Sequence, residues 1–241
     1  MTPRRLQQHW DKLGKEDAMW AILTDSNRKG GRWTPEEFFA EGRNEIAAVM
    51  EYLRKHGAPP RFRHALDFGC GIGRLSQALA DYCETVTGLD IAPSMVESAQ
   101  KWNRHGERCR YLVNGTPDLR QLPDQSFDLI YSNIVLQHMP TAMSWAYLGE
   151  FVRVLMPGGL LCFQIPSEPS GTLIGLLLRI LPVPVVRLIR KMDMYGTTPE
   201  RVKAIVEAAG ASIIDTQSDT AAGPHWKSFR YLALKPGKAW L

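Results

Sequence analysis

The sequence predicts an α/β fold in which a mostly parallel sheet carries helices on both faces. Short apolar runs alternate with helical patterns from about residue 58 onward, which is typical of strands joined by crossover helices. The chain has 241 residues, 44% of them apolar, and this suits one elaborated domain with a substantial core. We therefore expect a helical extension at residues 1–57 and a core at residues 58–241, with a helical lid inserted at residues 170–196.

The extension has the composition of amphipathic helices. Trp10, Leu13 and Trp20 stand as apolar points among charged residues. Thr34 followed by Pro35 is a helix start, because threonine caps the first turn and proline is favoured at the first helical position. The helix is expected to end at Gly57.

Alternating glycines follow the first predicted strand of the core, at residues 65–68. Gly69, Gly71 and Gly73 precede a helical pattern that begins at Arg74. A turn without side chains between a strand and a helix lets a ligand approach the backbone near the positive end of the helix. A dinucleotide motif needs a third glycine where Arg74 stands, so the loop suits an adenosyl amino acid better than a pyrophosphate.

Asp90 ends the second predicted strand, residues 85–90. An acidic side chain at this place can accept hydrogen bonds from both hydroxyls of a ribose. Ile91 and Met95 follow it, and Pro93 opens the next helix. These residues are expected to surround the same ligand.

The remaining strands are predicted from further apolar runs. Residues 126–133 form one strand, and residues 154–163 contain a helix end, a glycine turn and another strand. A helix at residues 199–209 stops at Gly210, and strands are expected at residues 211–218 and 230–234.

The chain resembles class I S-adenosylmethionine (SAM)-dependent methyltransferases, and the type 11 group among them, in four features and in their order. These features are the glycine loop, Asp90, the 126–133 strand and the Pro157–Gly159 turn. The resemblance covers about residues 58–166. It implies a Rossmann-like fold with a seven-stranded sheet, a helical insertion after the fifth strand, and SAM as the cofactor. The cofactor-binding residues that it implies are Asp67, Gly69, Gly71, Gly73, Asp90, Ile91, Met95, Asn114, Gly115, Leu119 and Asn133.

Two of these residues have specific expected roles. Asp67 would reach the ammonium group of SAM directly or through a water; alternatively, it caps the turn through local backbone hydrogen bonds. Asn133 would lie near the methionine portion.

His138 is the candidate catalytic residue. It follows the fourth strand in a segment that resembles the family's "vLqHi" run, at the edge of the sheet where α/β folds bind ligands. An imidazole titrates near neutral pH, so His138 could take the proton of an acceptor hydroxyl. The alternative is that it caps the next helix or holds a loop.

The two ends of the chain resemble bacterial methyltransferases of sugar and polysaccharide pathways, in residues 9–14, 30–33 and 223–231. The resemblance implies transfer to oxygen of a small-molecule, sugar or lipid-linked acceptor. Transfer to nitrogen of a metabolite, or SAM binding without catalysis, remains an alternative.

Residues 172–194 form an unusual segment, predicted as two short amphipathic helices with a basic face. The segment is too short, and too often broken by proline and arginine, to span a bilayer. It is interpreted as a lid with dimer contacts, which would make the protein a homodimer, or as a peripheral membrane surface.

The composition indicates which partners and which cellular location to expect. The net charge of +4 is spread along the chain, and residues 132–135 lack the motif of nucleic-acid methyltransferases, so nucleic acid is not an expected partner. Four cysteines without a C-x-x-C pair indicate buried thiols, and no metal site is predicted. The polar residues after Met1 argue against a signal peptide and favour the cytoplasm.

Overall fold

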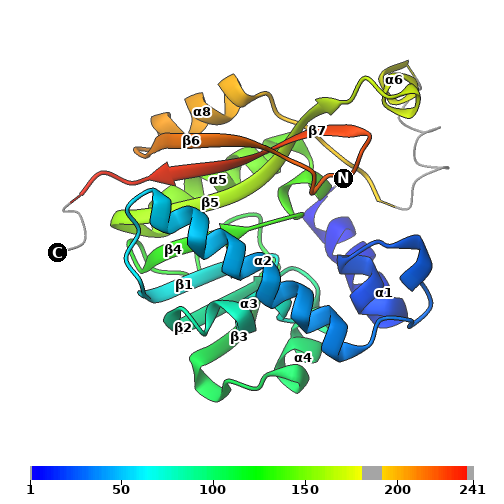
Figure 1. The fold of residues 1–241 in the computed structure, drawn as a ribbon, viewed down its shortest axis with the longest axis horizontal. Helices are drawn as coiled ribbons and strands as arrows, with labels where there is room; N and C mark the ends of the chain where they lie inside the picture. Colours follow the sequence, from blue (N-terminus) through cyan, green and yellow to red (C-terminus); the bar gives the residue numbers. More distant parts are fainter. Residues whose placement is uncertain (1, 181–191, 238–241) are drawn as a thin grey trace.

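The computed structural model describes residues 2–180 and 192–237. Its seven strands form one sheet in the order β3-β2-β1-β4-β5-β7-β6 (Figure 1). β1, β2, β3, β4 and β5 are parallel, and β7 runs antiparallel to both β5 and β6. The predicted mostly parallel seven-stranded sheet is confirmed. The strands are β1 Phe62–Phe68, β2 Cys83–Asp90, β3 Cys109–Val113, β4 Phe127–Ser132, β5 Leu155–Pro169, β6 Ser212–Asp219 and β7 Trp226–Leu234.

Helices cover both faces of this sheet. Along β1, successive side chains point to opposite faces: Ala65 packs in a core with α2 and α3, and Leu66 packs in a second core with α5 and α8. The prediction of helices on both faces is therefore confirmed. The helices are α1 Pro3–Ile22, α2 Pro35–Lys55, α3 Arg74–Leu79, α4 Pro93–Trp102, α5 Thr141–Val154, α6 Leu173–Ile180 and α8 Pro199–Ala208.

The residues before β1 are helical, as predicted. Thr34 caps α2 in a capping box with Glu37, whose side chain accepts from the Thr34 backbone. α1 bends sharply at Asp17, which has extended backbone angles. The Asp17 carboxylate accepts hydrogen bonds from the backbone of Gly30 and Gly31 at 2.8 and 2.9 Å, so the bend fixes the connection to α2.

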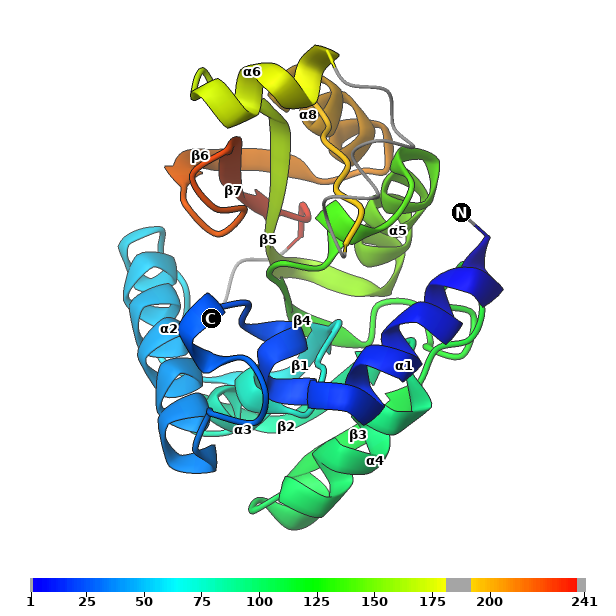
Figure 2. The same ribbon diagram turned by 90° about the vertical axis from the view of Figure 1, so that its right-hand side faces the viewer.

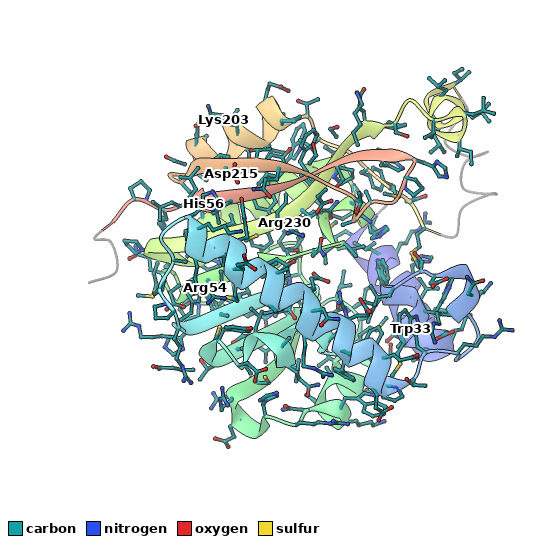
Figure 3. The ribbon with its side chains drawn as sticks, viewed as in Figure 1. Trp33, Arg54, His56, Lys203, Asp215 and Arg230 are labelled. Carbon is teal, nitrogen blue, oxygen red and sulfur yellow. The ribbon has the colours of Figure 1, made fainter. Side chains whose placement is uncertain are left out.

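The carboxyl-terminal end of α2 is attached to β6. The Tyr52 hydroxyl donates to Asp215 at 2.8 Å, and His56 Nε2 lies 3.3 Å from the same carboxylate (Figure 3). These contacts join the edge strand β6 to a helix that also packs on β1.

β5 and β7 are both longer than the sequence indicates. β7 begins at Trp226, not at Arg230, because Trp226 and Ser228 pair with the extension of β5 from Pro166 to Pro169. Thus part of the segment that resembles sugar-pathway enzymes, residues 223–231, is a sheet strand.

The segment after β5 begins with α6, which lies beyond the end of the sheet (Figures 1 and 2). Leu173 and Ile180 on this helix are 77% and 79% exposed. The second predicted helix, near residues 185–191, lies outside the described residues. No helix in residues 2–180 or 192–237 is long and apolar enough to cross a membrane.

Candidate functional site

A cavity of about 760 Å³ lies at the carboxyl ends of β1, β2 and β4. This is where α/β folds bind ligands, and the volume lies within the range of about 300–1,000 Å³ common for ligand pockets. Of the predicted site residues, the lining brings together Gly69, Gly71, Asp90, Ile91, Met95, Asn114, Asn133 and His138. Asp67, Gly73, Gly115 and Leu119 lie outside it.

The glycine loop takes a conformation that ordinary side chains rarely adopt. Gly69 and Gly73 have φ angles of +78° and +84°. A Cβ at Gly69 would overlap Val135, and one at Gly73 would lie 2.6 Å from the Tyr111 hydroxyl. The loop therefore needs glycine for its own packing, and Gly69 in addition presents backbone to the cavity.

Asp90 holds the glycine loop to the start of α4. One carboxylate oxygen accepts from the Gly71 N–H at 2.9 Å, and the other accepts from the Ala92 N–H at 2.8 Å. Burial raises the pKa of Asp90 above its ordinary value, while these backbone donors act in the opposite direction. Each oxygen retains a further lone pair for a ligand hydroxyl.

Asn133 lies in a polar network that sequence reasoning missed. Its amide nitrogen donates to Glu45 of α2 at 2.7 Å, and the Tyr131 hydroxyl donates to the same oxygen at 2.8 Å. The other Glu45 oxygen pairs with Arg74, whose side chain is 3% exposed, at 2.8 Å. Glu45 shows no motif signal, because it is one of several charges on α2 and only the packing of that helix turns it inward.

The Asn133 side chain has an unused acceptor. Its amide oxygen is buried and has no hydrogen-bond partner, although the residue lines the cavity. A buried acceptor without a partner costs free energy, so a ligand donor such as an ammonium group would stabilise it. Together with Asp90 and the exposed backbone of Gly69, this acceptor fits the polar groups of SAM.

Asp67 lies behind the loop and is 1% exposed. One oxygen accepts from the Ser76 hydroxyl at 2.6 Å, and the other has no partner. Burial is the main cause that raises the pKa of Asp67 to about 7. The structure places its hydrogen bond on α3 and not on the turn, and its contact with the cofactor stays a prediction.

The loop after β3 is organised by Asn114. Its side-chain nitrogen donates to the Asp118 carbonyl at 3.0 Å and to the Tyr147 hydroxyl at 3.1 Å. Leu119 is buried in the core with α5, and its N–H donates to Glu150 at 2.8 Å. Asn114 and Tyr147 line the cavity, whereas Gly115 and Leu119 support the loop from outside its lining.

His138 has a defined orientation. Its Nδ1 lies 2.9 Å from the Asp193 carbonyl, which fixes the proton on Nδ1 because a carbonyl only accepts. Nε2 therefore carries the lone pair, and the Gln137 amide nitrogen lies 3.1 Å from it. Burial lowers the pKa of His138 to about 4, so the ring is neutral at physiological pH. His138 does hold a loop, through Asp193, and the lone pair of its Nε2 accepts from the Gln137 amide, so Nε2 is available to an acceptor hydroxyl only when Gln137 turns away.

α1 contributes Leu6 and Trp10 to the lining of the cavity, and Figure 2 shows this helix in front of the sheet, next to α4. Gln7 donates to the Ile91 carbonyl at 2.9 Å, and the Asp11 carboxylate accepts from the Ser94 N–H in the first turn of α4 at 2.9 Å. Between these contacts, the Trp10 ring meets His138 edge-on at 5.3 Å. The extension thus supplies lining residues to the site.

The cysteines and acids do not add a metal centre to this site. All four cysteines are buried, as expected. Within the described ranges, no group of three His, Cys, Asp or Glu side chains is arranged to hold a metal ion.

Comparison with known proteins assigns the core of the chain. Residues 66–163 match the family model described as a methyltransferase domain. Over these residues the chain is similar to methyltransferases. The match spans β1 to β5 and so includes the glycine loop, Asp90, Asn133 and His138.

The curated proteins that this chain resembles are named for methyl transfer to different acceptors. The chain is 30% identical over 153 residues to 2-methyl-6-phytyl-1,4-hydroquinone methyltransferase of Synechocystis, covering 63% of this chain and 47% of that protein. It is 34% identical over 139 residues to malonyl-[acyl-carrier protein] O-methyltransferase of Serratia marcescens, covering 54% and 51%. The chain thus spans about half the length of these curated relatives. Neither name is that of a sugar-pathway enzyme, so the resemblance to that subgroup finds no support in them.

A solved structure resembles this chain along nearly its whole length. Magnesium protoporphyrin IX methyltransferase of Synechocystis, solved with bound S-adenosylhomocysteine (SAH), superposes with a TM-score of 0.68 at 21% identity. The alignment covers 97% of this chain and 99% of the other. This confirms the predicted fold, including the helices before β1.

Proposed function

We propose that this protein transfers a methyl group from SAM to an oxygen of a small-molecule acceptor. The observation that carries the proposal is one cavity lined by the glycine loop, Asp90 and a neutral, oriented His138. The methyltransferase relatives support the reaction class, and the solved relative with bound SAH supports the donor.

On the donor side, each residue acts through a contact already described. Asp90 accepts from the ribose hydroxyls, and the Asn133 amide oxygen accepts from the ammonium group. Gly69 and Gly71 lie against the amino-acid portion, and Ile91, Met95 and Asn114 surround the adenosine. When bound, SAM supplies an electrophilic methyl group with a neutral thioether as leaving group.

On the acceptor side, His138 is the proposed general base. The Asp193 carbonyl holds the proton on Nδ1, so Nε2 carries the lone pair and acts as the base once the acceptor hydroxyl replaces the Gln137 amide there. The low pKa makes this base weak but keeps it unprotonated across the physiological range. Trp10 and the rest of α1 exclude water from the reacting atoms.

The test separates donor binding from methyl transfer. His138→Gln should bind SAH within about threefold of the wild-type affinity by calorimetry. It should lose about 10²- to 10⁴-fold in transfer of tritiated methyl groups from SAM to a small-molecule extract, the usual contribution of a general base. His64→Gln, on the exposed side of β1, is the matched control. Equal transfer by both variants would remove His138 as the base, and absence of SAH binding by the wild type would refute the proposed function.

The role of residues 172–194 is the second part of this proposal. α6 exposes apolar side chains and Met192 and Met194 line the cavity, which supports a lid whose outer face meets another surface. Vesicle co-sedimentation and light scattering separate a membrane contact from a homodimer.

A further inference from the structure

Apart from the Gln137 amide at Nε2 and the Asp193 carbonyl at Nδ1, apolar side chains surround His138. The Trp10 ring meets the imidazole at 5.3 Å, and Met143 on α5 lines the same cavity. Asp193, whose carbonyl fixes the imidazole, lies between two lining methionines in the chain. The methionines next to His138 or next to Asp193 are Met139, Met192 and Met194.

The charged side chains of the lining belong to other segments. Among the described lining residues, they are Asp25, Lys29, Glu41, Arg74 and Asp90. These come from α2, the connection before it, the first residue of α3 and the last residue of β2. In the described segments 136–143, 192–194 and 220–223, which include His138, the one acidic side chain is that of Asp193, and Asp193 is not among the lining residues.

The separation of the charged lining residues from the lining around His138 restricts the chemistry of the acceptor. A carboxylate or phosphate buried beside His138 would lose its hydration without gaining a cationic partner from these segments. Methionine side chains are flexible and polarisable, and they make favourable sulfur contacts with aromatic rings. A cluster of methionines beside a tryptophan therefore suits an uncharged aromatic ring.

We infer that the acceptor is a phenol whose ring lies between Trp10 and the methionines, with its hydroxyl in place of the Gln137 amide at Nε2 of His138. This inference rests on the proposed function and names its substrate class. In the reaction, the phenol O–H bond breaks as its proton passes to Nε2. The oxygen forms the new bond to the methyl carbon, and the pair of the S–CH₃ bond returns to sulfur.

The acidity of the acceptor agrees with this assignment. The buried His138, with a pKa of about 4, is a weak base. A phenol has a pKa near 10, as tyrosine does, so it gives up its proton to such a base far more readily than an aliphatic alcohol does.

The first experiment measures binding with defined probes. Protein saturated with SAH is titrated calorimetrically with 4-ethyl-, 4-butyl- and 4-hexylphenol, with cyclohexanol, and with trans-aconitate. The phenols should bind, with affinity rising about fourfold for each methylene that becomes buried. Tighter binding of trans-aconitate or cyclohexanol than of 4-ethylphenol would overturn the inference.

The second experiment uses matched substitutions of methionine. Met143→Gln should weaken 4-butylphenol binding at least tenfold, and Met143→Leu should retain most of it, while both keep wild-type affinity for SAH. Met156→Gln, outside the cavity lining, is the control for the chemical change. Equal phenol affinity in Met143→Gln and Met156→Gln would overturn the assignment.

The third measurement is transfer of the methyl group to 4-butylphenol, followed as the aryl methyl ether by mass spectrometry. Wild-type protein should form the ether, and His138→Gln should bind the phenol without methylating it. If SAH binds and no phenol does, the substrate class fails while the proposed function stands. If SAH itself does not bind, the proposed function fails.

Discussion

Asp90→Asn tests the donor site most directly, because Asp90 has a structural and a proposed binding role at the same atoms. Its two oxygens accept from Gly71 and Ala92. Alanine would leave both N–H groups without an acceptor and confuse misfolding with lost binding. Asparagine keeps the shape and one acceptor, but turns an NH₂ group toward the other backbone donor.

The structural cost of this substitution follows from one lost backbone hydrogen bond. A buried donor without a partner costs about 1–3 kcal/mol. In a protein of this size, each kcal/mol lowers Tm by about 2–4 °C. The variant should therefore remain folded at 25 °C with a modestly lower Tm.

The binding cost should be larger. The neutral amide presents one acceptor where the carboxylate presents two, and hydrogen bonds to a charged group contribute about 1.5–3 kcal/mol each. We expect SAH affinity to fall by about 30- to 1,000-fold, corresponding to about 2–4 kcal/mol.

Calorimetric titration with SAH and thermal melts without ligand give the two quantities separately. Asp81→Asn, an exposed acid just after α3, is the matched control and should change neither. A lowered Tm with unchanged SAH affinity would show that Asp90 only holds the loop, and the ribose role would be refuted.

Three further predictions concern the carboxylates around the sheet. Burial raises the pKa of Asp67 from 3.8 to about 7, so the folded protein retains a proton there that the unfolded chain loses. The unfolding free energy should therefore fall by up to about 4 kcal/mol as pH rises from about 4 to 7. Asp67→Asn should flatten this dependence on pH in urea titrations. Glu45→Gln leaves the buried Arg74 without its ion-pair partner. The free energy of unfolding in urea should fall by about 3–5 kcal/mol. A second substitution in the same protein, Arg74→Met, should recover most of that loss. The hydrogen bond from Tyr52 holds the pKa of Asp215 below its ordinary value, so its contribution is fully present above about pH 4 and is lost as pH falls through the lowered pKa. Asp215→Asn should therefore cost about 1 kcal/mol at pH 7 and progressively less toward acid pH, and a loss independent of pH would contradict the reasoning.

Much of the fold could be predicted because its signals are local. The alternation of apolar runs with helical patterns gave the parallel strands, and Thr34 and Gly57 marked the ends of α2. The start of β7 was missed, since Trp226 is in a strand only through its pairing with the far end of β5. A strand that depends on a distant partner leaves little mark on its own sequence.

In the site, too, the residues that belong to a local motif were predictable from the sequence. Gly69 and Asp90 lie where the chain turns at the edge of the sheet, and such positions carry a motif. Glu45 acts through a side chain that the packing of α2 turns inward. Asp193 acts through its backbone carbonyl. Backbone groups have no sequence signature, so the residue that orients His138 could be found only from the structure.

The N-terminal extension and the donor site share one turn, and this links their stabilities. The chain after Asp90 gives its Ile91 carbonyl to Gln7 and its Ser94 N–H to Asp11, while Asp90 itself holds the glycine loop. A ligand on Asp90 therefore stabilises the same turn to which α1 is attached. Because α1 also brings Trp10 against His138, donor binding and closure over the acceptor depend on one set of hydrogen bonds. If SAM binds at Asp90 as proposed, we therefore expect the cavity under α1 to be formed most completely after the donor is in place.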